Sequence, residues 1–421
     1  MELKPGYKLT EVGVIPEDWE IISFGRIASI IDPQPDHRTP PETSGGEPYI
    51  GISDFITDTL IDWNGCRKII SKAVDKQQKD FQISHGDIIF GKIGTIGFPK
   101  FLPVTPFRYA LSANVILIKP KIEPHFLMSW LKSSLVQKQI NQELHSTSQA
   151  AFGILKMREL LIALPYAEEQ RLIATALSDM DELLGALDRL IAKKRDLKHS
   201  AMQQLLTGKT RLPEFDGEWE VKRLGDLGHF FKGSGVKKDE AQSGDLPCIR
   251  YGEIYTHHHN YIKSFNSWIS PEVARIAMPL KPGDILFAGS GETKEEIGKC
   301  VAFVDDIKAY AGGDIVILRP FSANAMFLGY YCNTGTINSQ KASKGQGDAV
   351  VHISANALSS IEIKIPKIPE QTAIATILSD MDAEITALEQ RRDKTRALKQ
   401  GIMQALLTGT TRLVSPEKVY V

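Results

Sequence analysis

The side chains best placed to do chemistry in this sequence include lysines that follow or interrupt glycine-rich stretches. Gly291–Cys300 has six residues between its two glycines, where a phosphate-binding P-loop has four, and it lacks the Ser or Thr that should follow Lys299. Gly91–Gly97 is rich in glycine but does not have the G-x-G-x-x-G spacing of dinucleotide-binding loops. We therefore predict no nucleotide site and interpret Gly91–Gly97 as a surface loop that follows a strand.

Two other motifs resemble parts of metal or nuclease sites but lack the partners that such sites need. His257–His259 are consecutive, and consecutive residues cannot easily converge on one metal ion, so we interpret them as a solvated run. Glu362–Lys364 has no convincing Asp partner, and its alternation of polar and apolar residues favours a strand edge. The Asn-Pro-Pro-aromatic tetrapeptide of amino-methyltransferases is absent. We predict a chain with no catalytic centre and no metal ion.

Composition limits the class of protein. The 421 residues allow two to four domains, and 50 basic against 51 acidic side chains give a net charge of −1, which excludes a uniformly basic nucleic-acid coat. Four cysteines without a C-x-x-C pair are typical of reduced thiols in a cytosolic chain. Without a signal peptide or a long apolar stretch, we expect a soluble cytoplasmic protein that does not bind a membrane.

One segment of the chain occurs twice. Glu169–Leu212 and Glu370–Leu413 align without a gap at an offset of 201, and 25 of their 44 positions are identical. The blocks of about 150 residues that precede the copies share only short echoes, such as Gly86–Phe90 and Gly283–Phe287. The repeated segments therefore perform one task twice, whereas the blocks share a fold and differ in their surfaces.

Both repeated segments are predicted to be long helices. Apolar residues from Ile374 to Ala405 advance mostly by three or four positions, and the first copy has the same period. Each copy ends in Leu-Leu-Thr-Gly, where Gly208 or Gly409 is the expected stop. About 40 residues make a rod of roughly 60 Å. Such a long apolar stripe needs a partner, which is the other copy or, alternatively, each helix's own domain.

The two blocks are predicted to be α+β domains. Short β-type runs bounded by Gly and Pro occur in both, and a helical stretch follows the second run of each. The predicted strands are Asp87–Phe90, Val115–Ile118, Asp284–Phe287 and Ile315–Leu318, and the predicted helices are Phe126–Leu135 and Met326–Tyr331.

Two similar modules on a stiff spacer suit the recognition of two short DNA half-sites at a fixed separation. Half-sites one helical turn apart lie ~34–36 Å from centre to centre, which the predicted rod can span. Since the modules differ, the half-sites should differ, and the whole site should be asymmetric.

Four motifs carry a resemblance to a known family. They are the opening Gly6–Glu20, the recurring Gly-Asp-Ile-(Ile/Leu)-Phe strand, the proline and Glu-Gln pair that lead into each long helix, and the Leu-Leu-Thr-Gly ending. In this order, over the whole chain, they resemble the specificity subunits of type I restriction–modification systems. The fold we expect has two similar globular target-recognition domains separated by two long helices that pair as an antiparallel coiled coil, with pseudo-twofold symmetry. The expected boundaries are domain 1 at 1–165, the first helix at 166–210, domain 2 at 211–366, the second helix at 367–411 and a tail at 412–421.

The resemblance also implies partners. It implies double-stranded DNA, two modification subunits that methylate adenine and two restriction or translocase subunits. S-adenosylmethionine, ATP and Mg²⁺ are then expected on the partner subunits, and no cofactor on this chain. Each recognition domain would read one half of a bipartite site through the major groove, while the helices set the gap and dock the modification subunits. The alternatives are a coiled-coil interaction scaffold and a specificity module for a fused methyltransferase or nuclease.

Candidate DNA contacts are polar residues in block loops that differ between the copies, because Arg and Gln read bases and Lys more often serves phosphates. Each could equally be an ordinary solvated loop residue. They are Lys92, Thr95, Arg108, Tyr109, Ser146, Thr147, Ser148 and Gln149 in the first block, and Arg250, Tyr251, Ser290, Glu292, Lys294, Lys341, Lys344 and Gln346 in the second.

Candidate partner contacts are polar residues identical in the two helices, because identical surfaces can bind identical subunits. The alternative is that they are capping and solvated residues kept alike by recent duplication. They are Gln170, Asp179, Asp181, Lys198, Gln203, Gln371, Asp380, Asp382, Lys399 and Gln404.

Overall fold

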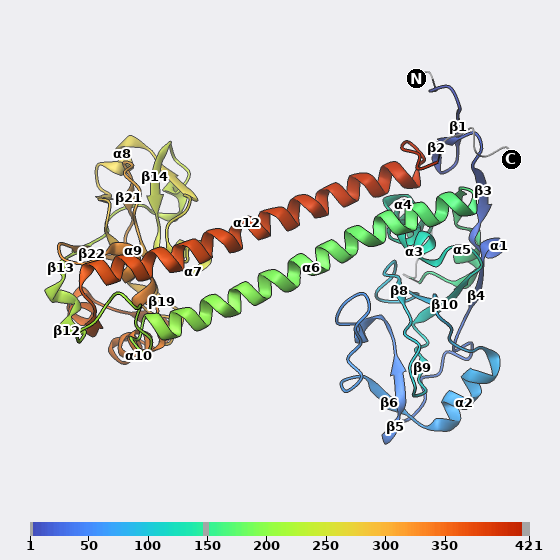
Figure 1. Cartoon of the computed structure of the whole chain (residues 1–421), viewed down its shortest axis with the longest axis horizontal. Helices are drawn as coiled ribbons and strands as arrows, with labels where there is room; N and C mark the ends of the chain where they lie inside the picture. Colours follow the sequence, from blue (N-terminus) through green and yellow to red (C-terminus); the bar gives the residue numbers. More distant parts are fainter. Residues whose placement is uncertain (1–2, 146–150, 415–421) are drawn as a thin grey trace. The chain divides into compact units, whose positions relative to one another are not determined.

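The computed structural model describes residues 3–145 and 151–414, which form two compact units. Unit 1 comprises Met1–Asp188 and Gln390–Val421, and unit 2 comprises Arg189–Glu389. Both repeated segments are long helices, as predicted: α6 spans Ala167–Leu205 and α12 spans Ile368–Leu407 (Figure 1). Each unit therefore contains one block together with a part of each long helix.

Unit 1 is built around a four-stranded sheet with the order β4-β10-β7-β8. A three-stranded sheet of order β6-β5-β9, the pair β11-β3 and the hairpin β1-β2 complete its strands. The strands are β1 Tyr7–Thr10, β2 Gly13–Pro16, β3 Glu20–Ser23, β4 Ala28–Ile31, β5 Glu42–Ile50, β6 Arg67–Ile69, β7 Ile88–Gly91, β8 Lys100–Phe101, β9 Ala110–Leu111, β10 Val115–Pro120 and β11 Leu161–Leu164. The short helices are α1 Phe24–Ile27, α2 Ser71–Asp80, α3 Pro124–Lys132, α4 Ser134–His145 and α5 Ile154–Glu159.

Unit 2 repeats this plan with a five-stranded sheet of order β13-β22-β18-β20-β15. A four-stranded sheet of order β16-β14-β21-β17 and the pairs β12-β24 and β19-β23 accompany it. Its strands are β12 Glu220–Arg223, β13 Gly228–Lys232, β14 Leu246–Ile249, β15 Asn260–Tyr261, β16 Ser267–Ile269, β17 Met278–Pro279, β18 Ile285–Ala288, β19 Ser290–Gly291, β20 Cys300–Ala302, β21 Tyr310–Ala311, β22 Ile315–Pro320, β23 Val351–His352 and β24 Glu362–Ile365. Its short helices are α7 Tyr251–Thr256, α8 Pro271–Ala274, α9 Ala325–Tyr331, α10 Gly335–Lys344 and α11 Ala355–Ser359.

The central strands of both units are buried on both faces, which explains their continuous apolar sequences. In β7, Ile88 and Phe90 pack into one cluster with α3 and α4, whereas Ile89 packs into a second cluster with the smaller sheet. In β18, Ile285 and Leu286 divide between two clusters in the same way. The predicted α+β class is confirmed, and β24 confirms the strand predicted at Glu362–Lys364.

Within each unit the two long helices run antiparallel. In unit 1, Lys399 of α12 bonds Asp181 of α6, and in unit 2 Lys198 Nζ of α6 lies 2.6 Å from Asp382 Oδ1 of α12. The residue numbers rise along one helix as they fall along the other, as Arg392 Nη1 and Asp188 Oδ1 also show at 3.6 Å. The pairing of the two copies predicted from the sequence is therefore present in both units.

Each long helix ends on a contact with the start of the other helix. Gly208 and Gly409 take φ of +68° and +67°, the left-handed conformation expected of a helix stop. The arginine three residues later then reaches a glutamate at the start of the other helix. Arg412 Nε lies 2.7 Å from Glu169 Oε1 in unit 1, and Arg211 Nη2 lies 2.7 Å from Glu370 Oε2 in unit 2.

No helix among the described residues is long and apolar enough to span a bilayer.

Candidate nucleic-acid interface

In each unit the loop after the central strand pairs with the segment that precedes the last short helix. In unit 1, Ile93 forms an antiparallel bridge with Ala151 just before α5. In unit 2, β19 pairs with β23 just before α11, with Ser290 opposite His352. In both units the fold thus places the loop after the central strand beside the segment before the last short helix.

Four of the predicted DNA contacts lie in the interior of their units. Lys92 Nζ lies 2.8 Å from Asp32 Oδ2, and the Tyr109 hydroxyl donates to Pro103 O at 2.6 Å. Ser290 is 3% exposed, and the fully buried Lys341 Nζ donates to the carbonyls of Gly298 and Cys332 at 2.7 and 2.9 Å. We withdraw Lys92, Tyr109, Ser290 and Lys341 as direct DNA contacts, because their polar atoms already have partners inside the protein.

Eight other predicted DNA contacts lie nearer the surface. Arg108 is exposed but bonds Asp75 and Glu47, which raise the pKa of its guanidinium and occupy two of its donors. The exposed side chains are those of Thr95, Arg108, Tyr251, Glu292, Lys294 and Gln346, and the half-buried ones are those of Arg250 and Lys344. Ser146, Thr147, Ser148 and Gln149 lie outside the described residues.

The predicted partner contacts divide into three groups. Gln170 Nε2 donates to Pro165 O and Gln371 Nε2 to Pro366 O, both at 2.8 Å, and both side chains are buried. A second group forms the ion pairs that join the helices, namely Asp181, Lys198, Asp382 and Lys399. Only Asp179, Gln203, Asp380 and Gln404 are exposed and outside these pairs. For the first two groups, sequence identity reflects internal contacts, so we withdraw them as partner contacts.

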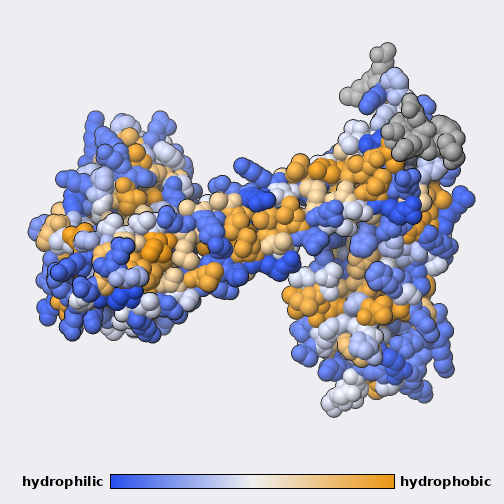
Figure 2. All heavy atoms as spheres, in the orientation of Figure 1, coloured by the Kyte–Doolittle hydropathy of each residue, from blue (hydrophilic) through white to orange (hydrophobic). Residues whose placement is uncertain are grey.

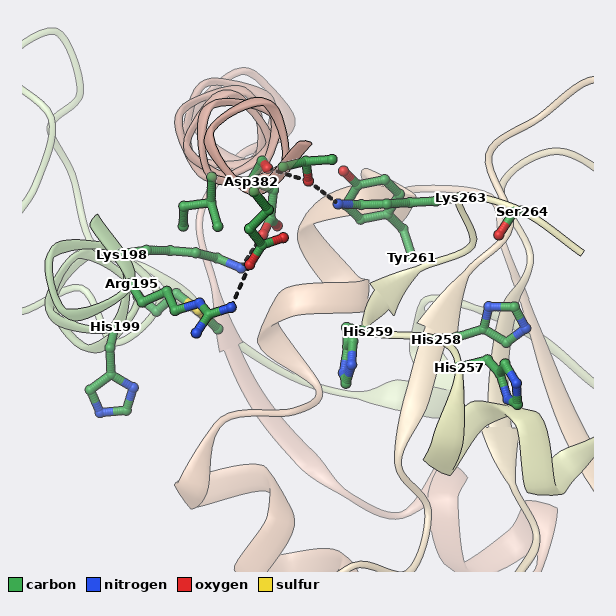
Figure 3. Close-up of a pocket in the computed structure, with 14 residues that line it drawn as sticks. Arg195, Lys198, His199, His257, His258, His259, Tyr261, Lys263, Ser264 and Asp382 are labelled. Carbon is green, nitrogen blue, oxygen red and sulfur yellow. Dashed lines mark hydrogen bonds and ion pairs between the residues drawn. The ribbon is translucent and has the colours of Figure 1, made fainter. Parts of the chain in front are cut away.

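A cavity of about 530 Å³ lies between the helix pair and the block of unit 2 (Figure 3). Arg195 and Lys198 line it from α6 and Asp382 lines it from α12, while Lys263 reaches across to α12, where its Nζ donates to Thr386 at 3.3 Å. Unit 1 has a cavity of about 500 Å³ lined by the residues at the offset of 201, Arg396, Lys399 and Asp181. The residues that line the two cavities from the helices are therefore repeated, whereas those that line them from the blocks are not.

The histidine run lies on this cavity but is not uniformly solvated, contrary to prediction. In the loop between α7 and β15, His257 and His259 are exposed, whereas His258 is 3% exposed. Burial, reinforced by His257, His259 and Lys299, lowers the pKa of His258 to about 4. Among the described residues no group of three or more His, Cys, Asp or Glu could hold a metal ion.

The residues opposite the post-strand loops are Ala151 and His352, and neither was predicted as a site residue from the sequence. They are related by the offset of 201 that relates the two helices. Extending the helix alignment back by 18 positions from Glu169 and Glu370 would have paired them. The signal was hidden because the intervening residues differ.

Apolar residues also reach the surface of the long helices (Figure 2). Leu183 and Leu197 of α6 are 41% and 48% exposed, and Leu398 of α12 is 59% exposed. Large contiguous apolar patches mark surfaces that bind another protein, whereas single exposed leucines are common on monomeric proteins.

Comparison with known proteins agrees with this architecture. The chain is 26% identical to a putative type I restriction enzyme MjaX specificity subunit of Methanocaldococcus jannaschii, over 97% of each chain, and 23% identical to the MjaVIII specificity subunit of the same organism, over 95% of this chain and 94% of that one. A solved structure of a type I R-M system, described for complex assembly and conformational transition, shares the fold with a TM-score of 0.55 and 19% identity, covering 94% of this chain and 99% of that chain.

A second structure, the S subunit of the type I restriction–modification system from M. genitalium, has a TM-score of 0.56 and 15% identity over 96% of this chain and 99% of that one. Residues 16–193 and 216–396 each match the family described as the type I restriction modification DNA specificity domain. The two matches cover most of the chain and include both blocks and most of both long helices. The chain therefore belongs to the type I restriction–modification DNA specificity family and carries two copies of its domain.

Proposed function

We propose that this chain supplies DNA specificity to a type I restriction–modification complex, with each unit reading one half of an asymmetric bipartite site. The observation that carries the proposal is the contrast between the repeated helices and the recognition blocks, whose loops differ at equivalent positions. Two different recognition domains on one repeated pair of helices suit a DNA site whose two halves differ. The assigned parts are recognition domains 1–165 and 211–366, helices 166–210 and 367–411, and tail 412–421.

The chain acts without a catalytic centre of its own. Two modification subunits would bring S-adenosylmethionine, and two restriction subunits would bring ATP and Mg²⁺. All of these components act in the cytoplasm. With a net charge of −1, the isolated chain should bind DNA weakly, because phosphate contacts supply most salt-sensitive affinity and the partners would complete the basic cleft.

The helices present one repeated surface that suits two identical modification subunits. Thr175, Asp179 and Ala186 of α6 are all exposed, and their spacings of four and seven residues put them on one face of the helix. The residues at the offset of 201 are identical and also exposed: Thr376, Asp380 and Ala387 of α12. We name each triad the docking face, one in unit 1 and one in unit 2.

Some exposed positions outside the docking face differ between the helices, whereas others, such as Lys193 and Lys394, are also identical. Glu182 corresponds to Ala383 and Ala192 to Asp393, and all four are exposed. Internal contacts do not explain the identity of the docking face, and binding of the same partner in both units would explain it.

Tryptophan substitutions test the docking role. Ala186→Trp and Ala387→Trp should each leave a purified complex with one modification subunit, and the double variant with none, because a large side chain blocks a close protein contact. Native mass spectrometry of the co-expressed complex measures the stoichiometry. Ala192→Trp is the matched control and should retain both subunits. Retention of two subunits by Ala186→Trp or Ala387→Trp would refute the docking face.

Single-molecule methylation mapping tests the proposed function as a whole. DNA from cells that express this chain with its modification subunit should carry methyladenine in one asymmetric bipartite sequence. Exchange of the region around Arg250 should alter one half of that sequence. A change in both halves, or in neither, would contradict the assignment of one half-site to each unit.

A further inference from the structure

The two units place one cross-strand pair at the same position of the fold. In unit 1 the Lys92 N–H donates to Asn114 O at 2.8 Å, and in unit 2 the Gly289 N–H donates to Asp314 O at 2.7 Å. These hydrogen bonds link the residue after β7 to the start of β10, and the residue after β18 to the start of β22. Residue by residue, the segment after β7 therefore corresponds to the segment after β18.

The opposite segment corresponds in the same way. Phe152 N–H donates to Lys92 O and Ile353 N–H donates to Gly289 O, both at 2.9 Å. One residue earlier, Ala151 bridges Ile93 in unit 1, and His352 pairs with Ser290 in unit 2. We name these two pairs, Ile93–Ala151 and Ser290–His352, the variable pair of each unit.

The variable pair of unit 1 is apolar. Ile93 is 44% exposed, and Ala151 is half-buried. An exposed isoleucine at a turn offers no hydrogen bond, but it can contact the C5 methyl group of thymine, which is the apolar feature of the major groove.

The variable pair of unit 2 is a hydrogen-bonding group held in one orientation. Ser290 Oγ and His352 Nδ1 lie 2.8 Å apart, and Ser290 is buried while His352 is exposed. Because the serine occupies one ring nitrogen, the other nitrogen of His352 is left to donate or accept a bond outside the protein. Ser290 is then a positioning residue, which agrees with its burial.

The surroundings of the variable pair also differ between the two units. In unit 1 the residue after the central strand is Lys92, whose Nζ forms an ion pair with Asp32 Oδ2 at 2.8 Å. In unit 2 glycine stands at position 289, and a cavity of about 270 Å³, lined by Lys232 and His352, opens beside it. A side chain cannot be added at position 289 freely, since a Cβ there would lie 2.9 Å from Asp314 O. The cavity leaves room beside His352 for a base edge and offers a lysine for a phosphate.

We propose that the variable pair is a base-reading position in each unit, where Ile93 contacts a thymine methyl group and His352 hydrogen-bonds a base edge in the major groove. The inference rests on the proposed function and adds the residues that distinguish the two half-sites.

Paired substitutions test the proposal in the complete complex with modification subunits. His352→Ala should relax discrimination at one base pair of one half-site by about fivefold or more, as expected for the loss of a base contact. Ile93→Ala should relax one base pair of the other half-site by about fourfold, since less apolar contact remains. Methylation rates on an oligonucleotide library randomised in both half-sites measure both effects. His229→Ala, an exposed histidine on β13, is the control and should leave both half-sites unchanged.

The outcomes separate this inference from the proposed function. Relaxation confined to opposite half-sites supports it, whereas unchanged discrimination or relaxation of the same half-site by both variants overturns it. If the wild-type complex methylated no bipartite sequence, the proposed function itself would fail. Because both side chains are exposed, each variant should keep the wild-type urea midpoint, and this measurement identifies a loss caused by misfolding.

Discussion

Unit 1 and unit 2 share a framework but not an interior. The order β4-β10-β7 recurs as β13-β22-β18, and α4 recurs as α10. At equivalent positions of these helices, unit 1 buries Ile140 and unit 2 buries Lys341. The comparison teaches that apolar periodicity determines the framework of both units. A single buried position can still change from an apolar to a charged residue when neighbouring backbone carbonyls accept its hydrogen bonds.

Exchange at this position should give the largest effect. Ile140→Lys should destabilise unit 1 by about 4 kcal/mol or more. The new ammonium group would be buried without hydrogen-bond acceptors to offset its loss of hydration. Lys341→Met removes two hydrogen bonds to backbone carbonyls, but it also removes a buried amine whose pKa is lowered by burial. Because these two effects oppose each other, the stability of unit 2 should change by less than about 2 kcal/mol. Urea unfolding of the full chain measures both. Equal costs for the two variants would show that unit 2 has no special accommodation for lysine.

The arginines that follow the long helices give the next effect. Arg412 bonds both Glu169 and Asp18 and lies over the Trp19 ring at 5.7 Å, whereas Arg211 bonds Glu370 and lies over the Trp219 ring at 5.9 Å.

Arg412→Met should cost unit 1 about 3 kcal/mol, because it leaves the buried carboxylate of Glu169 without its cation. Arg211→Met should cost unit 2 somewhat less, because its arginine bonds one carboxylate instead of two. The free energy of unfolding in urea measures both, and Arg396→Met, at an exposed arginine, is the control with little change. A larger loss for Arg211→Met than for Arg412→Met would reverse the comparison.

The sequence predicts the parts of the fold that depend on local pattern. The long helices and the strands β7, β10, β18 and β22 follow from apolar periods and glycine stops, and the structure has them. It does not predict the burial of Lys341, because one of its acceptors is the carbonyl of Gly298, 43 residues away. The sequence also misassigns Gln170 and Gln371 as partner contacts. The two residues are identical because each donates a hydrogen bond to a proline carbonyl within its own unit.

The candidate site is predictable only in outline. Loops that differ between the blocks identify the region, but the partner of each loop depends on strand pairing. Ser290 lies 62 residues from His352 in the sequence, and only the pairing of β19 with β23 brings the two side chains within hydrogen-bonding distance. The sequence therefore identifies Ser290 and misses His352.

The cavities beside the helix pairs predict a difference in pH dependence. In unit 2 the pKa of His258 is lowered to about 4, so folding opposes its protonation. Unfolded chains bind the proton near pH 6.5, and stability should therefore be complete above that pH and fall as the pH decreases towards 4.

His258→Gln should reduce the loss of folding stability at low pH by about 1–2 kcal/mol, a figure that allows for solvent screening. In unit 1 the corresponding cavity is lined by Asp58, whose pKa is lowered to about 2 by Lys100 and Lys132 although burial raises it, so it stays ionised over this range. Urea unfolding of the full chain at pH 7.5 and 5 measures the difference, with the exposed His257→Gln as control. An unchanged pH dependence in His258→Gln would rule out this titration.

The ion pairs between the long helices give the smallest expected difference. In unit 2, Asp382 accepts from Lys198 at 2.6 Å and from the Tyr330 hydroxyl at 2.6 Å, and its side chain is 16% exposed. In unit 1, Asp181 is 57% exposed, and Ser129 stands at the position equivalent to Tyr330.

Asp382→Asn should therefore cost about 1–2 kcal/mol and Asp181→Asn less than about 1 kcal/mol, since exposed pairs contribute little. Added salt should reduce the effect of Asp181→Asn more than that of Asp382→Asn, because solvent ions reach only the exposed pair. Equal costs with equal salt dependence would mean that the tyrosine adds nothing to the helix pairing of unit 2.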